Sequence, residues 1–229
     1  MKIQTFSITS KSGQILNLSL SLLLVFSVFN LIDGWASAPI DEKGVLSEAF
    51  ATLQGNDFIR AIEYFMIAAT KLTMFEVFRR CLNKAGHKIA QFTLTILMAL
   101  IFSLAMADIL PMFLFSSLER VQSLIHGGCP SLFYSFSKVT YVVLVITHFV
   151  LSLQLVKNFA GKIRLFGAAF FGCQVITWLA NLAYLFIYTS VAGVSMDDIM
   201  TYSKMADVFG SAVGLIPYFL LRTTMVAED

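Results

Sequence analysis

Three charged residues lie in a helix-length apolar segment, residues 58–78. At 100° per residue, Arg60, Glu63 and Lys71 fall within an arc of about 80° on a helix. An ionisable group at the centre of a membrane costs about 2.5–3.5 kcal/mol on insertion scales. Such a stripe either pairs within a helical bundle or lines a polar pathway, and both interpretations stay open. Glu63 is the more informative residue, because Lys71 can extend its long stem toward the cytosolic surface.

Two further apolar segments carry single polar groups. His148 lies near the middle of residues 139–156. We expect a neutral, hydrogen-bonded imidazole that faces the bundle, with a proton relay or a haem ligand as the alternative. In residues 165–188, a polar face contains Gln174 and Asn181 together with Thr177 and Trp178. Hydrogen bonds across helices are the ordinary use of such a face, and a substrate-lining wall is the sharper hypothesis.

No arrangement of residues predicts catalysis. The chain lacks an HExxH motif, a Walker motif and a catalytic Ser-Lys or Asp-rich membrane motif, so we name no catalytic residue and do not expect an enzyme. Cys81, Cys129 and Cys173 are far apart and without CxxC spacing, which leaves no metal or redox centre. His126 stands near Cys129 without further ligand partners. We therefore expect neither a metal nor a cofactor.

The elements that position these residues are membrane-spanning helices. The 229 residues are 58% hydrophobic and 13% charged, with a mean hydropathy of +0.80, far from soluble domains. Long continuous apolar blocks predict an all-α, polytopic transmembrane helical bundle in a single integral membrane domain, residues 1–229. No basic run interleaved with aromatic residues suggests nucleic acid, so the lipid bilayer is the expected partner. About six crossings are expected, at residues 15–32, 58–78, 89–110, 139–156, 165–188 and 205–221, with an outer loop at residues 33–57.

Basic residues alternate between the two sides of this topology. One side holds ten and the other four, which places both termini in the cytosol by the positive-inside rule. The densest cytosolic anchor follows the second crossing, and a smaller one follows the fourth. The cytosolic set comprises Lys2, Lys11, Arg79, Arg80, Lys84, Lys88, Lys157, Lys162, Arg164 and Arg222, and the outer set comprises Lys43, Arg120, Lys138 and Lys204.

The N-terminal segment imitates a secretory signal, with Lys2 and Lys11 before an apolar run and Ala36-Ser37-Ala38 after it. Pro39 would follow the cleaved bond, where its rigid backbone suits a protease poorly. The apolar run is also longer than a usual signal core of about 7–15 residues. We therefore expect the first helix to be retained.

The last crossing carries small residues at helical spacing. Gly210 and Gly214 form a GxxxG pattern, which predicts close packing against another helix, within the bundle or in a homo-oligomer. Pro217 removes a backbone donor and is expected to kink this helix.

The C-terminal part resembles a bacterial inner-membrane domain family known only as one of unknown function. The resemblance lies in the ending Ile216-Pro217-Tyr218-Phe219-Leu220 after an acidic loop, and in the basic Phe78-Arg79-Arg80 hairpin before a helix whose acidic counterpart is Asp108. Family members usually have about four crossings and a Trp where this chain has Leu215. The resemblance implies the bacterial inner membrane as location and a multi-pass topology, and no mechanism.

Two functional classes follow. The first is a non-catalytic membrane subunit or interaction protein, whose partners are other membrane proteins or further copies of the chain. The second is a small transporter or channel-like protein that uses the charged second helix. The first is preferred, because corresponding halves show no pair of broken helices of the kind found in many transporters.

Overall fold

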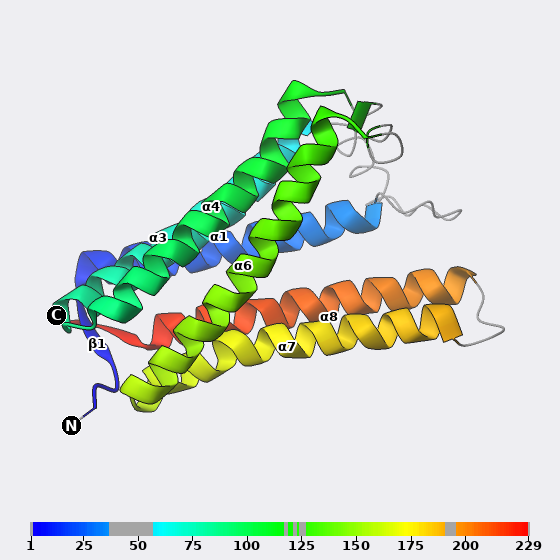
Figure 1. Cartoon of the computed structure of the whole chain (residues 1–229). Coiled ribbons are helices and arrows are strands. Elements are labelled where there is room, and N and C mark those ends of the chain that lie inside the picture. Colours follow the sequence, from blue (N-terminus) through cyan, green and yellow to red (C-terminus); the bar gives the residue numbers. More distant parts are fainter. Residues whose placement is uncertain are drawn as a thin grey trace.

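A computed structural model describes residues 2–36, 57–116, 119–120, 123, 127–190 and 196–228 of the chain. These residues form an all-α bundle with a very small sheet (Figure 1). Most of the predicted outer loop, residues 37–56, lies outside the described residues, as does His126. The elements in chain order are β1 (Phe6–Thr9), α1 (Ser10–Ala36), α3 (Asp57–Lys84), α4 (Lys88–Leu114), α6 (Cys129–Asn158), α7 (Gly161–Ser190), α8 (Met196–Thr223) and β2 (Met225–Glu228).

Five of these helices, α1, α4, α6, α7 and α8, contain stretches that are long and apolar enough to cross a membrane. α3 is equally long, but Arg60, Glu63, Lys71 and Glu76 interrupt its apolar run, and it does not qualify by composition. α1 and α4 pack along it, and α8 contacts it as well. Its charged groups therefore have protein on two sides rather than lipid all round, which is how ionisable residues persist in membrane helices.

The helices extend beyond the predicted crossings at both ends. The largest difference is α6, which begins at Cys129 instead of residue 139. The break is formed by Gly127 and Gly128, both with positive φ, whereas Pro130 belongs to the first helical turn, where a missing N–H is harmless. α4 likewise runs past its predicted end, because Pro111 is accommodated inside its last turns.

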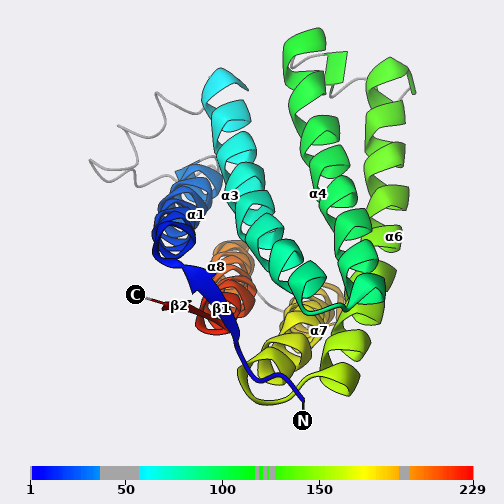
Figure 2. The same cartoon turned by 90° about the vertical axis from the view of Figure 1, so that its left-hand side faces the viewer.

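The bundle has the form of a V. α3, α4 and α6 are inclined to α1, α7 and α8, and the two groups converge near the chain termini and diverge toward the opposite end (Figures 1 and 2). Short connections at the converging end join α3 to α4 and α6 to α7. We call this end the terminal end, and all of the predicted cytosolic basic residues belong to segments that meet there.

A parallel pairing of β1 with β2 ties the two chain ends together. Phe6 aligns with Met225, and Arg222 donates a hydrogen bond to the carbonyl of Met225 at 2.7 Å. The backbone N–H of Ala160 donates to the carbonyl of Ile3, which joins the N-terminal segment to the α6–α7 turn. We call this arrangement the terminal clasp. Local patterns did not predict it, since four-residue strands more than two hundred residues apart leave little signal.

α1 is part of the bundle, where it packs against α3 and α8. Leu16 and Leu23 are fully buried, and Phe6 and Ile8 of β1 also belong to the core. Cleavage after residue 38 would remove all four side chains from this core, and retention of the first helix stays a prediction.

Aromatic rings fill the converging end of the V. They contact one another in a continuous series with centroid separations of 5.2–5.8 Å, mostly in edge-to-face geometry. The series begins at Tyr218 in α8 and ends in β1 and the α6–α7 turn. We call it the aromatic plug, and it consists of Tyr218, Phe75, Phe170, Phe166, Phe78, Phe6 and Phe159.

Candidate intramembrane cavity

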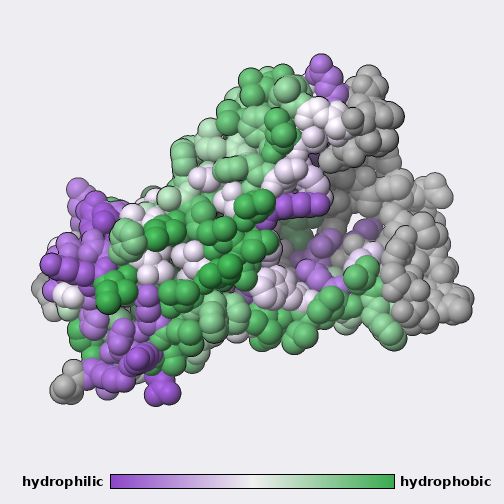
Figure 3. Space-filling model, in the orientation of Figure 1, coloured by the Kyte–Doolittle hydropathy of each residue, from purple (hydrophilic) through white to green (hydrophobic). Residues whose placement is uncertain are grey.

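A cavity of about 330 Å³ lies between the two arms of the V, directly beside the aromatic plug. Figure 3 shows the molecule hollowed between the inclined helices and the α7–α8 pair, with hydrophilic residues visible inside. Five helices contribute to the walls, and its volume is at the lower end of the range for small-molecule sites. The polar residues of the lining are Tyr64, Lys71, Asp108, Tyr141, His148, Gln174, Thr177 and Tyr218.

Lys71 and Tyr218 form the part of the cavity closest to the plug. The ammonium of Lys71 lies 5.5 Å from the centroid of the Tyr218 ring, a cation–π contact between α3 and α8. No carboxylate of the described residues lies within ion-pairing distance of Lys71. The expectation that Lys71 extends to the cytosolic surface is therefore wrong, because the ring of Tyr218 holds the ammonium inside the bundle.

His148 enters the same cavity from α6. Its ring lies 4.4 Å from that of Phe170, and both ring nitrogens are buried without a hydrogen-bond partner among the described residues. The predicted bundle-facing position is confirmed, but the predicted hydrogen bond is absent from the part of the chain that the structure describes. A buried imidazole without a partner is unusual, since buried polar groups are nearly always hydrogen-bonded.

Tyr141 of α6 links that helix to α7 in the wall of the cavity. Its hydroxyl accepts hydrogen bonds from Gln174 Nε2 and Trp178 Nε1, both at 3.1 Å. The predicted polar face of α7 thus bonds across to a neighbouring helix, and Gln174 and Thr177 also line the cavity. Asn181, one turn further along, is exposed and is not part of the lining.

No family model, curated protein or solved structure matches the chain.

The resemblance of the C-terminal part to an inner-membrane family accordingly stays a prediction, and the site rests on its own geometry. Of the residues predicted to line a polar pathway or to pair helices, the cavity brings together Lys71, Asp108, His148 and Gln174. Arg60 and Glu63 are not among its lining residues, although Glu63 is buried. Lys71, and not Glu63, is therefore the residue of the charged stripe that lines the cavity and is the more informative one to mutate.

Three tyrosines of the cavity were not singled out from the sequence. Tyr64 follows Glu63 on α3, Tyr141 lies on α6, and Tyr218 lies in the Ile-Pro-Tyr-Phe-Leu ending. A tyrosine within a membrane helix is a usable signal, because its hydroxyl needs a partner or a wet surface at that depth. The number of candidates is small enough to test, since the chain has seven tyrosines in all.

The small residues of α8 have two different uses. A Cβ on Gly210 would lie 3.4 Å from Thr177 Cγ2, so this glycine brings α8 close to α7. Gly214 has open space where a Cβ would be, and with Pro217 it lines the cavity. The tightest glycine contact between helices was not predicted: a Cβ on Gly167 would lie 2.7 Å from Leu155 Cβ, and Ser152 donates a hydrogen bond to the Gly167 carbonyl.

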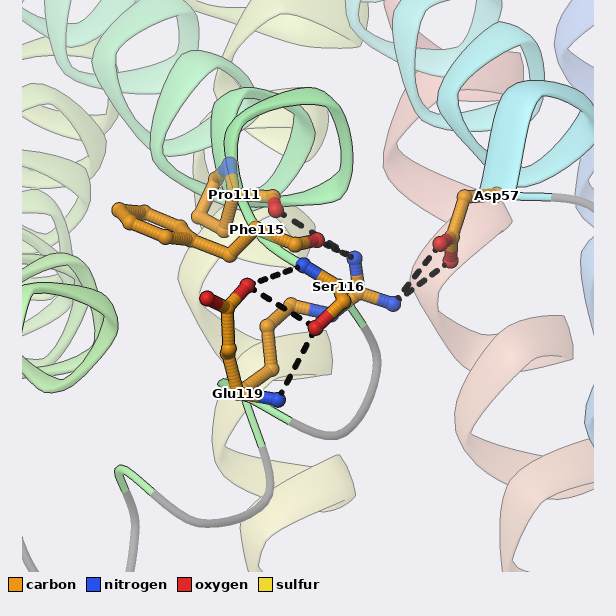
Figure 4. A network of polar contacts seen from close by, with 6 residues as sticks. Asp57, Pro111, Phe115, Ser116 and Glu119 are labelled. Carbon is orange, nitrogen blue, oxygen red and sulfur yellow. Dashed lines mark hydrogen bonds and ion pairs between the residues drawn. The ribbon is translucent and has the colours of Figure 1, made fainter.

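An ion pair joins the start of α3 to Arg120, which follows the end of α4 (Figure 4). The guanidinium of Arg120 donates to both carboxylate oxygens of Asp57 at 2.8 and 2.9 Å, and also to the carbonyls of Pro111 and Phe115. One side chain thus satisfies terminal carbonyls of α4 and connects that helix to the start of α3. The contact holds together two helices that form adjacent walls of the cavity.

A second hollow lies between α4 and α6 and is almost wholly apolar. It has a volume of about 680 Å³ and no charged residue in its lining. Its surface suits lipid chains or an apolar helix rather than a polar solute. The residues around it are Phe102, Ser103, Met106, Ala107, Leu110, Phe115, Cys129, Leu132, Phe133 and Phe136.

Proposed function

We propose that the protein binds a small solute inside the membrane, in the manner of a small transporter or carrier. The observation that carries this proposal is a cavity with a polar floor, enclosed by five helices of an otherwise apolar bundle. Solute sites of membrane transporters commonly lie at this depth, between two groups of helices that can move relative to each other. Lys71, His148 and Tyr218 form the part of the cavity that we call its floor, and these side chains are the ones proposed to contact the solute.

The direction of access follows from the positions of the basic residues. They gather at the terminal end, which the positive-inside rule assigns to the cytosol of a bacterial inner membrane. The aromatic plug and the terminal clasp separate the cavity from that end. We therefore propose that the conformation described is closed to the cytosol and accessible from the opposite side.

Cysteine labelling tests this arrangement with two positions on the same helix. Ala105 lines the cavity, whereas Ala90 is 2% exposed and lies on α4 near the terminal end. In a background without native cysteines, a charged, membrane-impermeant maleimide added to spheroplasts is expected to label Ala105→Cys and to leave Ala90→Cys unlabelled. Mass spectrometry of the intact protein gives the labelled fraction.

Unfolding in detergent must expose both cysteines equally, which controls for reactivity. Labelling of Ala105→Cys only from inverted vesicles would reverse the proposed direction of access. No labelling of Ala105→Cys from either side would remove the solute-binding proposal, because a cavity without access cannot exchange a ligand.

The non-catalytic subunit or interaction protein, which the sequence favoured, is now the second candidate, and the apolar hollow between α4 and α6 favours it. A partner helix seated there would bury the exposed side chains of Phe102, Leu132 and Phe136. Recovery of one stoichiometric membrane partner from native membranes, with loss of that partner on Leu132→Lys, is the result that would favour this function over solute binding.

A further inference from the structure

We propose that the solute is a small organic anion whose carboxylate binds Lys71, with His148 beside it as a second donor. This inference rests on the proposed function and adds the charge and chemical class of the ligand. It begins from an imbalance in the cavity floor. The floor contains N–H donors that have no hydrogen-bond acceptor in the described part of the protein.

The amine of Lys71 is the first part of that imbalance. Its ammonium has three N–H donors and no acceptor capacity, and its recorded contact is the face of the Tyr218 ring. A ring face attracts a cation but does not neutralise it. Buried charges in proteins are ordinarily paired or hydrogen-bonded, so an ammonium in this position has room for an anion.

His148 supplies the second part. Neither of its ring nitrogens has a hydrogen-bond partner among the described residues, although both are buried. A neutral imidazole carries one N–H donor, which suits a carboxylate oxygen. Lys71 and His148 come from α3 and α6, which are not adjacent in the bundle, and both line the same cavity. A ligand between them would connect the two helices through one anionic group.

Asp108 is the acidic residue of the lining, and it does not fill this role. The side chain is exposed and forms no ion pair with Lys71 in the described structure. Both helices can be measured from the converging end at 1.5 Å of rise per residue. On this scale Asp108 lies about 10 Å further from that end along α4 than Lys71 does along α3. Asp108 therefore leaves Lys71 without a carboxylate partner in the described structure.

The walls above the floor define the rest of the ligand. Ile67, Leu104 and Leu144 present aliphatic surface, and Phe170 presents an aromatic ring. An apolar body with a single anionic end matches a cavity that has Lys71 and His148 on its floor and these aliphatic and aromatic side chains in its walls. The volume of about 330 Å³ suits a molecule of one or two rings rather than a two-chain phospholipid.

Matched probes test the inference on the full chain in nanodiscs of phosphatidylcholine, which carry no net charge. We use 1-naphthoate and its neutral isostere 1-naphthamide, and measure each Kd by calorimetric titration. The unmodified protein is expected to bind the carboxylate at least tenfold more tightly than the amide. Lys71→Met is expected to abolish that preference, Lys71→Arg to retain most of it, and Asp108→Asn to leave it intact or to strengthen it.

Thermal stability of the ligand-free protein is the second readout. Because Lys71 has no counter-ion in the described structure, Lys71→Met is expected to melt at the same temperature as the unmodified protein or at a higher one. A clearly lower melting temperature, or failure to fold, would show that the charge is satisfied within the protein and would overturn the inference. Equal affinities for naphthoate and naphthamide in the unmodified protein would overturn it as well.

A further experiment tests whether the bound anion is a lipid headgroup instead of a free solute. Nanodiscs that contain phosphatidylglycerol are expected to leave the Kd of 1-naphthoate unchanged, whereas competition would reassign the site to an anionic lipid headgroup. The labelling of Ala105→Cys distinguishes the two proposals. If naphthamide protects that cysteine as well as naphthoate does, the cavity is a solute site and only the inferred charge is wrong.

Discussion

Gly161 shows how a single residue positions the end of the bundle. It opens α7 with φ of +54°, and a Cβ there would lie 2.9 Å from Gln4 Cβ in the N-terminal segment. Gly161→Ala is expected to lower the free energy of unfolding by about 1–2 kcal/mol, since a left-handed conformation costs a residue with a Cβ that much. Chemical unfolding in detergent, followed by tryptophan fluorescence, measures the change.

Gly172 on the same helix is the matched control. A Cβ on Gly172 would have no neighbour within 4 Å, and its backbone is helical. Gly172→Ala should be neutral or stabilise the protein by up to about 1 kcal/mol through helix propensity. Equal losses in the two variants would mean that the turn of the α6–α7 connection does not depend on Gly161.

At the scale of elements, the contact between Arg120 and Asp57 sets how α3 and α4 meet. Their side chains are 23% and 31% exposed, so solvent weakens the ion pair without removing it. In a double-mutant cycle with Asp57→Asn and Arg120→Gln, we expect a coupling energy of about 1 kcal/mol. Thermal unfolding of the four proteins at low and high salt provides the measurement.

The two single variants are not expected to be equivalent. Arg120→Gln should cost more than Asp57→Asn, because Arg120 also donates to the carbonyls of Pro111 and Phe115 at the end of α4. Additive effects with no coupling would show that the helices are held together by their apolar packing alone. Asp57 would then serve only the first turn of α3.

The whole molecule is organised by the terminal clasp, which places the N- and C-terminal segments side by side. Reporter domains joined through flexible linkers to the two ends must therefore report the same side of the membrane. The positive-inside rule predicts the cytosol for both. A phosphatase that is active only outside the cytosol and a fluorescent protein that matures only inside it distinguish the sides.

Opposite signals from the two termini would contradict the parallel pairing of β1 with β2 in the membrane-inserted protein. A signal from outside at both termini would keep the fold and reverse its orientation. In that case the cavity would open toward the cytosol, and the direction of solute access proposed above would change with it.

The positions of the helices were predictable, because each depends on local features of the chain. Apolar blocks of membrane length located α1, α4, α6, α7 and α8, and the charges of α3 marked that helix as different. The helix ends were less accurate. α6 begins at Cys129 instead of residue 139, and α4 continues to Leu114 with Pro111 inside its last turns, because the ends of a helix depend on where its terminal carbonyls and N–H groups find partners.

Length, apolar periodicity and the distribution of basic residues were enough to predict a helical membrane bundle with Lys71, His148 and Gln174 as candidates. Only the tertiary structure decided between Glu63 and Lys71, because Tyr218, almost 150 residues later, holds the Lys71 ammonium inside the cavity. A helical wheel assigns a side chain to a face, and the partner on that face comes from a distant segment. The terminal clasp was not predictable for the same reason. Its two strands come from opposite ends of the chain, and they meet only when the helices between them have packed.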